Sequence, residues 1–221
     1  MIRPDRNDET PDKKIFPGHT LESLEMRQPD DTSPNDYRVF FRAWLSKPLR
    51  TGASVPSSRA LSEAMAAAAA PAPSAKIVEL GPGTGTVTQA LLDAGVREEN
   101  LTLIELNDEF RDLLKKRFPR AEILAEDAFS AITRLMQTKE RDVSAVVSSL
   151  PLTLYPKEKR IRLRDEALRL TGPNGRLVQF TYSPISPMPH DPAVIAHCSR
   201  RIWTNLPPAA VWCYRARLDT P

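Results

Sequence analysis

Three glycines and one acidic residue stand close together in KIVELGPGTGTVTQALL, residues 76–92. Gly81, Gly83 and Gly85 alternate, and Glu79 comes two positions before the first of them. Gly81 and Gly83 permit positive φ and let a ligand approach where a Cβ would clash, and Gly85 lets the following helix pack closely. A tight strand-to-helix turn is the simpler explanation, but such a turn does not need three alternating glycines and a strand-end acid. We therefore predict a ligand-binding turn.

The spacing of the glycines narrows the class of ligand. A dinucleotide-binding turn is expected to read Gly-x-Gly-x-x-Gly, whereas this chain has Gly-x-Gly-x-Gly. A phosphate-binding P-loop is excluded because no Gly-Lys-Ser/Thr follows. A second acid, Glu105, ends the apolar segment LTLIE, near the offset of about 20 residues at which a strand-end carboxylate can bind two ribose hydroxyls. The pattern therefore predicts a site for a ligand that contains ribose.

The elements that position these residues follow from the hydrophobic pattern beyond Ser74. We expect strands at residues 76–80, 101–105, 121–124, 142–148 and 176–182, and helices at about 86–94, 108–117, 128–138 and 157–171. This alternation predicts an α/β fold with βαβ units and helices on both faces of a parallel sheet. The segments SRRIWTN and AVWCYRARL are separated only by LPPA, which is too short for a crossover helix. We expect them to form an antiparallel β-hairpin at the sheet edge.

The length of 221 residues suits one α/β domain with an appended segment. Two cysteines are too few for a disulfide framework and lack zinc-type spacing, so we expect a reducing, cytoplasmic location and no metal. No stretch approaches the roughly 20 apolar residues of a membrane span, and the first residues lack an apolar signal segment. The net charge of +3 does not by itself distinguish between classes of partner.

The chain before residue 75 divides into two parts. Residues 1–36 carry nine acidic and five basic side chains without helical or strand periodicity, so we expect a flexible N-terminal arm. In residues 37–74, an amphipathic helix is expected to end at Pro48, and an Ala-rich helix capped by Ser57 or Ser58 follows and runs to about Ala70. Residues 75–221 then form the ligand-binding domain.

The segment YRVFFRAWLSKPLR, residues 37–50, has four basic side chains and no acidic one. Aromatic side chains at a membrane surface bury themselves among the headgroups, and cations attract anionic lipid. A helix packed on its own sheet is the simpler alternative, but the concentration of aromatic residues favours membrane contact. The residues expected at the membrane are Tyr37, Arg38, Phe40, Phe41, Arg42, Trp44, Leu45 and Lys47.

The string ELGPGTG resembles motif I of the S-adenosylmethionine-dependent methyltransferases with a Rossmann-like fold. The resemblance covers roughly residues 75–221 and implies a mostly parallel, twisted, seven-stranded sheet. It implies S-adenosylmethionine as cofactor and S-adenosylhomocysteine as product, with Glu79 toward the methionine end, Glu105 at the ribose and Asp127 near the adenine. The cofactor-binding residues that it implies are Glu79, Gly81, Pro82, Gly83, Thr84, Gly85, Glu105, Leu106, Asp127, Ala128 and Ser149.

The loop after the fourth predicted strand, VVSSLPLTLY, indicates the acceptor. In this fold family the loop lies beside the reactive methyl group. Members that methylate the amino group of a nucleic acid base carry Asn or Asp, then Pro, then an aromatic residue that stacks on the extruded base. This chain has Ser148, Ser149, Leu150, Pro151 and Leu152 there. We therefore expect no nucleic acid partner and keep an RNA adenine N6-methyltransferase as the alternative function.

A more specific resemblance runs through FFRAWLSKPLRTGASVPSSRALSEAMA, the glycine turn, the SLPL loop and NLPPAAVWCYRAR. It is to the bacterial phospholipid N-methyltransferases, which convert phosphatidylethanolamine to phosphatidylcholine. It implies methyl transfer to phosphatidylethanolamine and its mono- and dimethyl derivatives by a peripheral protein on the anionic inner face of the cell membrane. We expect a monomer. A protein that binds the cofactor without catalysis is a third class.

Two tyrosines are the candidates for the catalytic site. Tyr155 and Tyr182 each follow a predicted core strand, where aromatic faces could hold the methylated ammonium by cation–π attraction. Half-buried packing residues are the alternative. The segment PKEKRIRLRDEALRL places five basic residues between Lys157 and Arg164, as a second membrane contact or as a solvated helix face.

Overall fold

The computed structural model describes residues 58–137, 143–183, 185–205 and 207–218. The arm at residues 1–36 and the expected membrane segment at residues 37–47 lie outside this part of the chain. The strands are β1 (Lys76–Leu80), β2 (Leu101–Ile104), β3 (Glu122–Leu124), β4 (Val143–Ser148), β5 (Arg176–Thr181), β6 (Val194–Cys198) and β7 (Ala210–Ala216). The α-helices are α2 (Arg59–Ala69), α3 (Thr86–Asp93), α4 (Asp108–Arg117), α5 (Ala128–Gln137) and α6 (Lys157–Thr171), with 3-10 turns η3 (Glu98–Asn100) and η4 (Leu152–Leu154).

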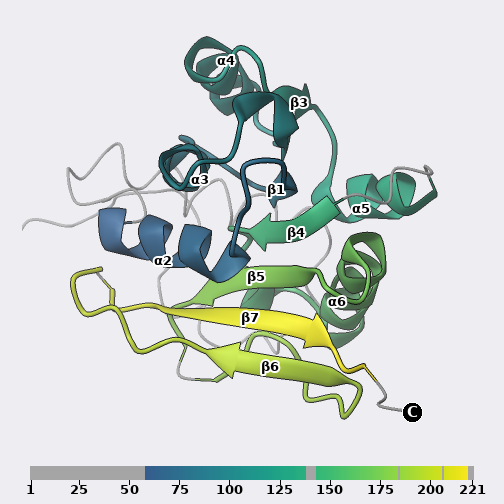
Figure 1. Ribbon diagram of the computed structural model, residues 1–221. Helices are drawn as coiled ribbons and strands as arrows, with labels where there is room; N and C mark the ends of the chain where they lie inside the picture. The colour runs from purple at the N-terminus through teal and green to yellow at the C-terminus, as the bar shows by residue number, and fades with distance from the viewer. Residues whose placement is uncertain (1–57, 138–142, 184, 206, 219–221) are drawn as a thin grey trace, which may run out of the picture.

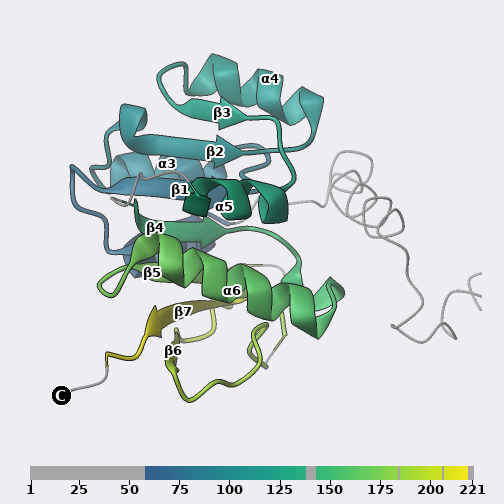
Figure 2. The same cartoon turned by 90° about the vertical axis from the view of Figure 1, so that its right-hand side faces the viewer.

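The strands form a seven-stranded sheet in the order β3-β2-β1-β4-β5-β7-β6 (Figure 1). The first five strands pair in parallel, whereas β7 runs antiparallel to both β5 and β6. Helices α5 and α6 cover one face of the sheet, and α2 and α3 lie behind it (Figure 2). The predicted mostly parallel α/β sheet with helices on both faces is confirmed.

The core consists of two hydrophobic clusters separated by the sheet. Successive side chains of a strand point to opposite faces, so Ile77 packs with α2, α3 and α4, and Val78 packs with α5 and α6. Both side chains are almost fully buried. Burial on both faces explains why β1 and β4 read as continuous apolar segments in the sequence.

Helix α2 begins at the edge of the sheet where the parallel strands end. The hydroxyl of Ser58 accepts a hydrogen bond from the Leu61 amide (3.2 Å), so the predicted cap is confirmed. The Ser58 amide donates to Oδ1 of Asn205 in the β6–β7 connection (2.8 Å). At the other end of α2, the Ala68 carbonyl accepts from Arg176, the first residue of β5. Helix α2 therefore runs from the carboxyl edge of the sheet to its amino edge (Figure 1).

The first arm of the hairpin lies earlier in the chain than expected. Strand β6 is Val194–Cys198, and it pairs with β7 from Val194↔Ala216 to Cys198↔Trp212. Residues 199–205, which were expected to be a strand, belong to the connection and make one isolated bridge between Ile202 and Ala209. The amides of Ser199 and Ile202 still donate to the carbonyls of Val211 and Ala209, but the pairing does not continue to Asn205, which is buried and bonded to the start of α2.

Candidate functional site

The glycine turn lies at the carboxyl edge of the sheet, between the ends of its central strands. The Gly81 amide donates to the carbonyl of Ile104, the last residue of β2 (2.9 Å). On the other side, the Ser149 amide donates to the carbonyl of Leu80 at the end of β1 (2.9 Å). These bonds bring the turn, the end of β2 and the loop after β4 together, as the sequence predicted.

Each of the three glycines has a positive φ: +68° at Gly81, +56° at Gly83 and +80° at Gly85. A Cβ on Gly85 would lie 2.5 Å from Cε2 of Phe118, so this glycine lets α3 pack closely, as predicted. A Cβ on Gly83 would meet no atom of the described residues within 4 Å. The backbone of Gly83 therefore borders open space, which a ligand can occupy.

Glu79 is fully buried at the end of β1, directly before the glycine turn. Its Oε2 accepts a 2.7 Å hydrogen bond from the hydroxyl of Thr88 in α3, whereas its Oε1 accepts none from the described residues. Burial is the main cause that raises the pKa of Glu79 to about 7; the Thr88 hydrogen bond opposes this rise, and nearby Glu105 contributes to it. A buried carboxylate oxygen with spare capacity fits a cationic donor such as the methionine ammonium of the expected cofactor.

Glu105 follows β2 and is also buried. Its two oxygens accept hydrogen bonds from the amides of Gly83 (3.0 Å) and Asn107 (2.9 Å). Burial raises its pKa, and these backbone donors oppose the shift. Arg111 of α4 fixes the same corner by donating to the carbonyls of Glu105 and Leu106. Since a carboxylate can accept about four hydrogen bonds, Glu105 retains the capacity to bind ribose hydroxyls.

The other residues expected to bind the cofactor, among them Asp127 and Ala128 at the adenine, border the same edge. Leu106 is exposed, with 45% of its surface accessible. The carboxylate of exposed Asp127 accepts from the Phe129 amide (2.9 Å) and so caps α5 beside the half-buried Ala128. Pro82 is buried and Thr84 is half-buried within the glycine turn, where the Thr84 carbonyl accepts from Arg117. Their contact with adenine or methionine stays a prediction.

The loop after β4 contacts the glycine turn and is hydrogen-bonded to β5. Leu150 is buried, and its Cδ2 would lie 3.0 Å from a Cβ on Gly81, which couples the loop to the glycine turn. Gln179 of β5 is also buried, and its Nε2 donates to the Leu150 carbonyl (2.9 Å). Leu152, the residue after Pro151, is 1% exposed. The position that carries a base-stacking aromatic in the amino-directed nucleic acid enzymes is therefore occupied by a core leucine.

The two candidate tyrosines belong to different clusters. The ring of Tyr155 lies 5.0 Å from that of Phe129 on the α5 and α6 face. Tyr182 lies 5.4 Å from Phe180 on the α2 and α3 face. Burial raises the pKa of Tyr182, and a hydrogen bond with Asn205 opposes the shift. Both rings are half-buried, which leaves part of each accessible to a ligand.

The basic residues that begin α6 have divided roles. Arg164 is 2% exposed, and its guanidinium pairs with Asp191 (2.6 Å). Arg160 donates to the Pro187 carbonyl (2.6 Å). These two arginines hold the β5–β6 connection on α6, so they are not free for a membrane. Lys157 and Lys159 are exposed, so they remain candidates for contact with a membrane.

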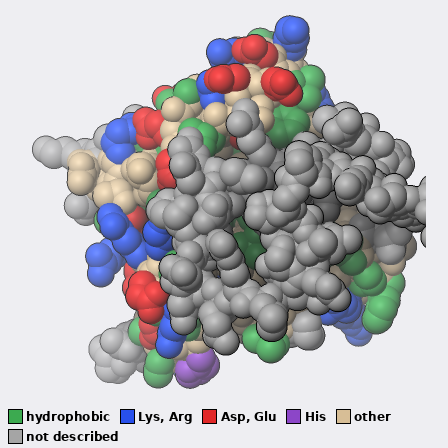
Figure 3. Space-filling view, turned by 180° about the vertical axis from the view of Figure 1, so that it is seen from behind, with side chains coloured by type: hydrophobic (Ala, Val, Ile, Leu, Met, Phe, Trp, Pro, Cys, Tyr) green, Lys and Arg blue, Asp and Glu red, His purple; other side chains and the backbone are tan. Residues whose placement is uncertain are grey.

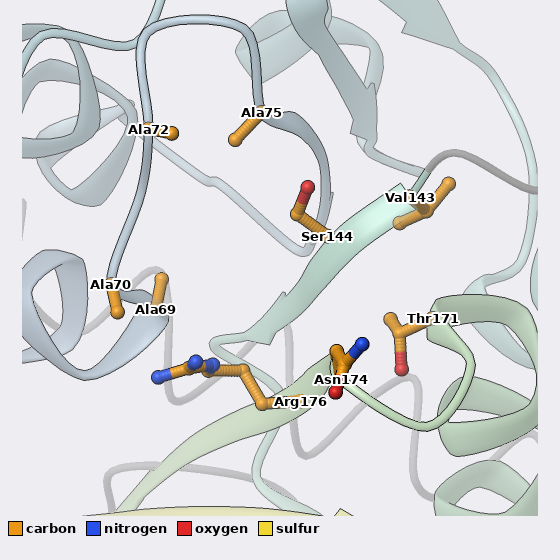
Figure 4. Close-up of a pocket in the computed structure, with 10 residues that line it drawn as sticks. Ala69, Ala70, Ala72, Ala75, Val143, Ser144, Thr171, Asn174 and Arg176 are labelled. Atoms are coloured by element: carbon orange, nitrogen blue, oxygen red, sulfur yellow. The ribbon is translucent and has the colours of Figure 1, made fainter.

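A hollow of about 370 Å³ lies at the opposite edge of the sheet (Figure 4). Its walls come from the end of α2, the starts of β4 and β5 and the turn after α6. Among the described residues that line it, Arg176 is the only charged one, and its guanidinium donates to the Ala68 carbonyl. Glu79 and Glu105 both lie at the carboxyl edge, so we assign the cofactor to that edge. The described residues contain no group of three or more His, Cys, Asp or Glu that could hold a metal.

The sequence that forms this site was compared with models of known protein families. Residues 77–175 match the family model described as "Methyltransferase domain". This part of the chain is similar to a methyltransferase domain. The match runs from β1 to the start of β5 and so contains the glycine turn, Glu105 and the loop after β4.

Relatives of the methyltransferase domain fall into two groups. The ornithine lipid N-methyltransferase of Singulisphaera acidiphila is 31% identical over 111 residues, which are 49% of this chain and 58% of that protein. The ribosomal RNA small subunit methyltransferase A of Methylococcus capsulatus is 40% identical over 91 residues, which are 40% of this chain and 34% of that protein. The chain thus spans less than two thirds of the length of these curated relatives.

The fold is that of the S-adenosylmethionine-dependent methyltransferases. The 1,6-didemethyltoxoflavin-N1-methyltransferase of Burkholderia thailandensis, solved with S-adenosylhomocysteine, superposes with a TM-score of 0.61. The superposition covers 85% of this chain and 92% of that one at 16% identity. The predicted fold and its cofactor, S-adenosylmethionine, are confirmed at this level.

Several residues that shape the site were not singled out from the sequence. Thr88 holds Glu79, Gln179 holds Leu150, and Arg111 braces the corner at Glu105. A polar residue on the buried stripe of a predicted helix, as at Thr88, is a signal that sequence reading could have used. Gln179 offered a similar signal, because it interrupts the apolar strand RLVQFT.

Proposed function

We propose that this protein is a lipid N-methyltransferase that transfers methyl groups from S-adenosylmethionine to the amine of phosphatidylethanolamine and its mono- and dimethyl derivatives, giving phosphatidylcholine. The observation that carries the proposal is the loop after β4. Ser149 stands where an amide would bind the amino group of a base, and buried Leu152 stands where an aromatic would stack on it. An apolar loop suits a small aliphatic amine better than a planar base.

The similarity to an ornithine lipid N-methyltransferase supports a lipid amine as the acceptor. The match covers about half of this chain, so the choice of phosphatidylethanolamine over other aminolipids rests on the sequence resemblance. No helix of the described part is long and apolar enough to cross a membrane. We propose that the contact is peripheral and that residues 37–47 supply it on the cytoplasmic face.

The residues of the carboxyl edge fit the cofactor and divide its parts among them. Glu79 offers its spare oxygen to the methionine ammonium, Glu105 faces the ribose, and the turn around Gly83 leaves room for the cofactor backbone. Leu106 and Asp127 border the adenine. The bound cofactor supplies a methyl group on a positively charged sulfur, which an uncharged amine can attack.

The acceptor amine must lose a proton before it attacks. A primary ammonium has a pKa near 10, so it is mostly protonated at neutral pH. Desolvation against the apolar side chains of the loop after β4 lowers the pKa of an ammonium. As methylation proceeds, the product approaches a quaternary ammonium, which the half-buried ring of either Tyr155 or Tyr182 can hold by cation–π attraction.

An RNA adenine N6-methyltransferase is the second candidate, because the chain is 40% identical to a ribosomal RNA methyltransferase over 91 residues. The two functions separate in a competition assay. The purified chain receives labelled S-adenosylmethionine together with phosphatidylethanolamine vesicles and ribosomal RNA. Label in the lipid fraction supports the lipid enzyme, whereas label in RNA alone selects the alternative. Binding of the cofactor with no label in either acceptor would select a protein without this catalysis.

A further inference from the structure

Two large apolar side chains stand out on the carboxyl edge of the sheet. Trp203 is 76% exposed and Ile185 is 73% exposed, and these are the highest values among the exposed large hydrophobic residues of the described chain. Trp203 lies in the β6–β7 connection, which starts where β6 ends beside the first residues of β7. Ile185 follows β5 by four residues. Both therefore lie at the edge where the glycine turn and the loop after β4 also lie.

The connection that carries Trp203 is firmly held although its tryptophan is exposed. Asn205 is buried, and it accepts from the Ser58 amide and donates to the Pro207 carbonyl (2.7 Å). Ile202 bridges to Ala209 and packs against the α2 face. The structure therefore presents the indole of Trp203 to the outside from an ordered loop.

The two loops are joined to each other. The guanidinium of Arg201, in the Trp203 loop, donates to the carbonyl of Tyr182 (2.6 Å), three residues before Ile185. The Ile185 amide in turn donates to the hydroxyl of Ser183 (3.1 Å). We call Trp203 and Ile185 the apolar pair. Its two loops flank Tyr182, one of the candidates for holding the acceptor ammonium.

The charges of this edge are unevenly distributed. Arg200, in the same connection as Trp203, is an exposed cation, and on the other face of the sheet the start of α6 carries exposed Lys157 and Lys159 with exposed Glu158 between them. The exposed acids Asp108 and Asp127 lie on the other half of the edge, beyond β2 and β3. In Figure 3, hydrophobic and basic side chains are visible together at the lower right. Exposed apolar groups beside cations are complementary to an anionic bilayer surface.

The position of α2 adds a further argument. The chain enters α2 at Ser58, which is bonded to Asn205 in the Trp203 loop. Residues 37–47, the proposed membrane segment, precede this point by only ten residues. The chain therefore enters the described fold at the edge that carries Trp203.

We propose that Trp203 and Ile185 insert into the headgroup region of an anionic membrane and orient the carboxyl edge toward the bilayer. Tryptophan suits this depth because its ring is apolar and its N–H can remain hydrogen-bonded near the headgroups. The inference rests on the proposed function, since it names the surface that brings a lipid amine to the site. It adds a second contact, within the folded domain, to the contact expected from residues 37–47.

The test uses the fluorescence of Trp203 in the full chain. The double variant W44F/W212F leaves Trp203 as the only tryptophan. With vesicles of phosphatidylethanolamine and an anionic phospholipid, we expect a blue shift and quenching by lipids brominated near the headgroups. Absence of quenching while the protein sediments with the vesicles would overturn the inference, and so would a blue shift that depends on protein concentration without lipid, which indicates a second copy of the chain.

Substitution gives an independent measurement. The variant W203S/I185S should lower the vesicle partition coefficient on the order of tenfold, because both side chains leave the apolar interface. The matched control is I195S/L218S, which removes two side chains that are 46% and 56% exposed away from this edge and should leave partition unchanged. Equal partition of both variants would contradict the inference. Methylation of lipid with an unquenched Trp203 would reject only this surface, whereas a quenched Trp203 without lipid methylation would reject only the proposed function.

Discussion

The hydroxyl of Thr88 donates a 2.7 Å hydrogen bond to Oε2 of Glu79, and both side chains are fully buried. This bond joins the first turn of α3 to the end of β1, directly behind the glycine turn. It occupies one oxygen of the carboxylate and leaves the other without a partner among the described residues. The fold thus positions the Glu79 carboxylate through Oε2, while Oε1 remains able to accept a hydrogen bond from a ligand.

The first prediction concerns the stability of the fold against pH. Burial raises the pKa of Glu79 from 4.5 to about 7 in the folded state. Because the folded state then holds the proton more tightly than the unfolded state, the stabilisation is complete below about pH 4.5 and is lost as the pH rises to about 7. Glu79→Gln removes this titration, so the difference in unfolding free energy between wild type and variant should change by on the order of 3 kcal/mol across this window.

Denaturant unfolding at a series of pH values measures this difference. Glu63→Gln is a suitable control, because Glu63 lies on the surface of α2 in an exposed pair with Arg59. Its unfolding curve should follow that of the wild type at every pH. If the unfolding free energies of wild type and Glu79→Gln changed with pH in parallel, the pKa of Glu79 would be the same in the folded and unfolded states, and the prediction would be contradicted.

The second prediction separates the roles of two glycines. Gly85→Ala places a Cβ 2.5 Å from the Phe118 ring at a φ of +80°, so it should lower the unfolding free energy by at least about 2 kcal/mol. Gly83→Ala meets open space and should cost only about 1 kcal/mol for its positive φ, yet it should weaken S-adenosylmethionine binding. Thermal unfolding and titration calorimetry measure the two effects. An equally large loss of stability in both variants would reject this division.

The third prediction identifies Gln179 as a positioning residue for the loop after β4. Its Nε2 donates to the carbonyls of Leu150 (2.9 Å) and Phe180 (2.7 Å). Gln179→Leu removes the donors, so we expect roughly tenfold slower methyl transfer at saturating cofactor, with the dissociation constant for S-adenosylmethionine nearly unchanged. Gln89→Leu on the exposed side of α3 is the control. If the cofactor affinity falls as much as the rate, Gln179 supports the whole edge and not the acceptor loop.

The fourth prediction separates cofactor binding from membrane binding. Glu105→Ala removes the acceptor for the Gly83 and Asn107 amides, so S-adenosylmethionine binding should be lost while sedimentation with anionic vesicles continues. Phe41→Ser with Trp44→Ser should do the reverse, because these aromatics belong to the proposed membrane segment. For each variant, vesicle sedimentation measures membrane binding and calorimetry measures S-adenosylmethionine binding. Unchanged sedimentation of the Phe41 and Trp44 variant would remove this segment from the membrane contact.

The parallel part of the fold was predictable because its signals are local. Strands that are buried on both faces, such as β1, read as apolar runs, and Ser58 caps α2 where a short polar residue precedes an amphipathic stretch. The glycine turn was equally predictable from the sequence, because each of its three positive φ angles favours glycine, and glycine stands at all three positions.

The edge beyond β5 was harder to predict because contacts between distant residues determine it. Asn205 bonds to Ser58 across most of the chain, and this bond ties the end of residues 199–205 to α2. Strand β6 takes their place although most of its side chains are exposed, so it gave no buried pattern to read. Likewise, the sequence did not reveal that Arg164, one of the basic residues of α6, is buried and paired with Asp191.

The central claim is that the acceptor is a lipid amine. The most direct measurement incubates the purified full chain with methyl-labelled S-adenosylmethionine and vesicles of phosphatidylethanolamine and an anionic lipid, and identifies the extracted lipids by mass spectrometry. We predict labelled mono-, di- and trimethylated phosphatidylethanolamine, and no such products from the Glu105→Ala variant. Wild-type protein that binds the cofactor and the vesicles but forms no methylated lipid would contradict the proposal.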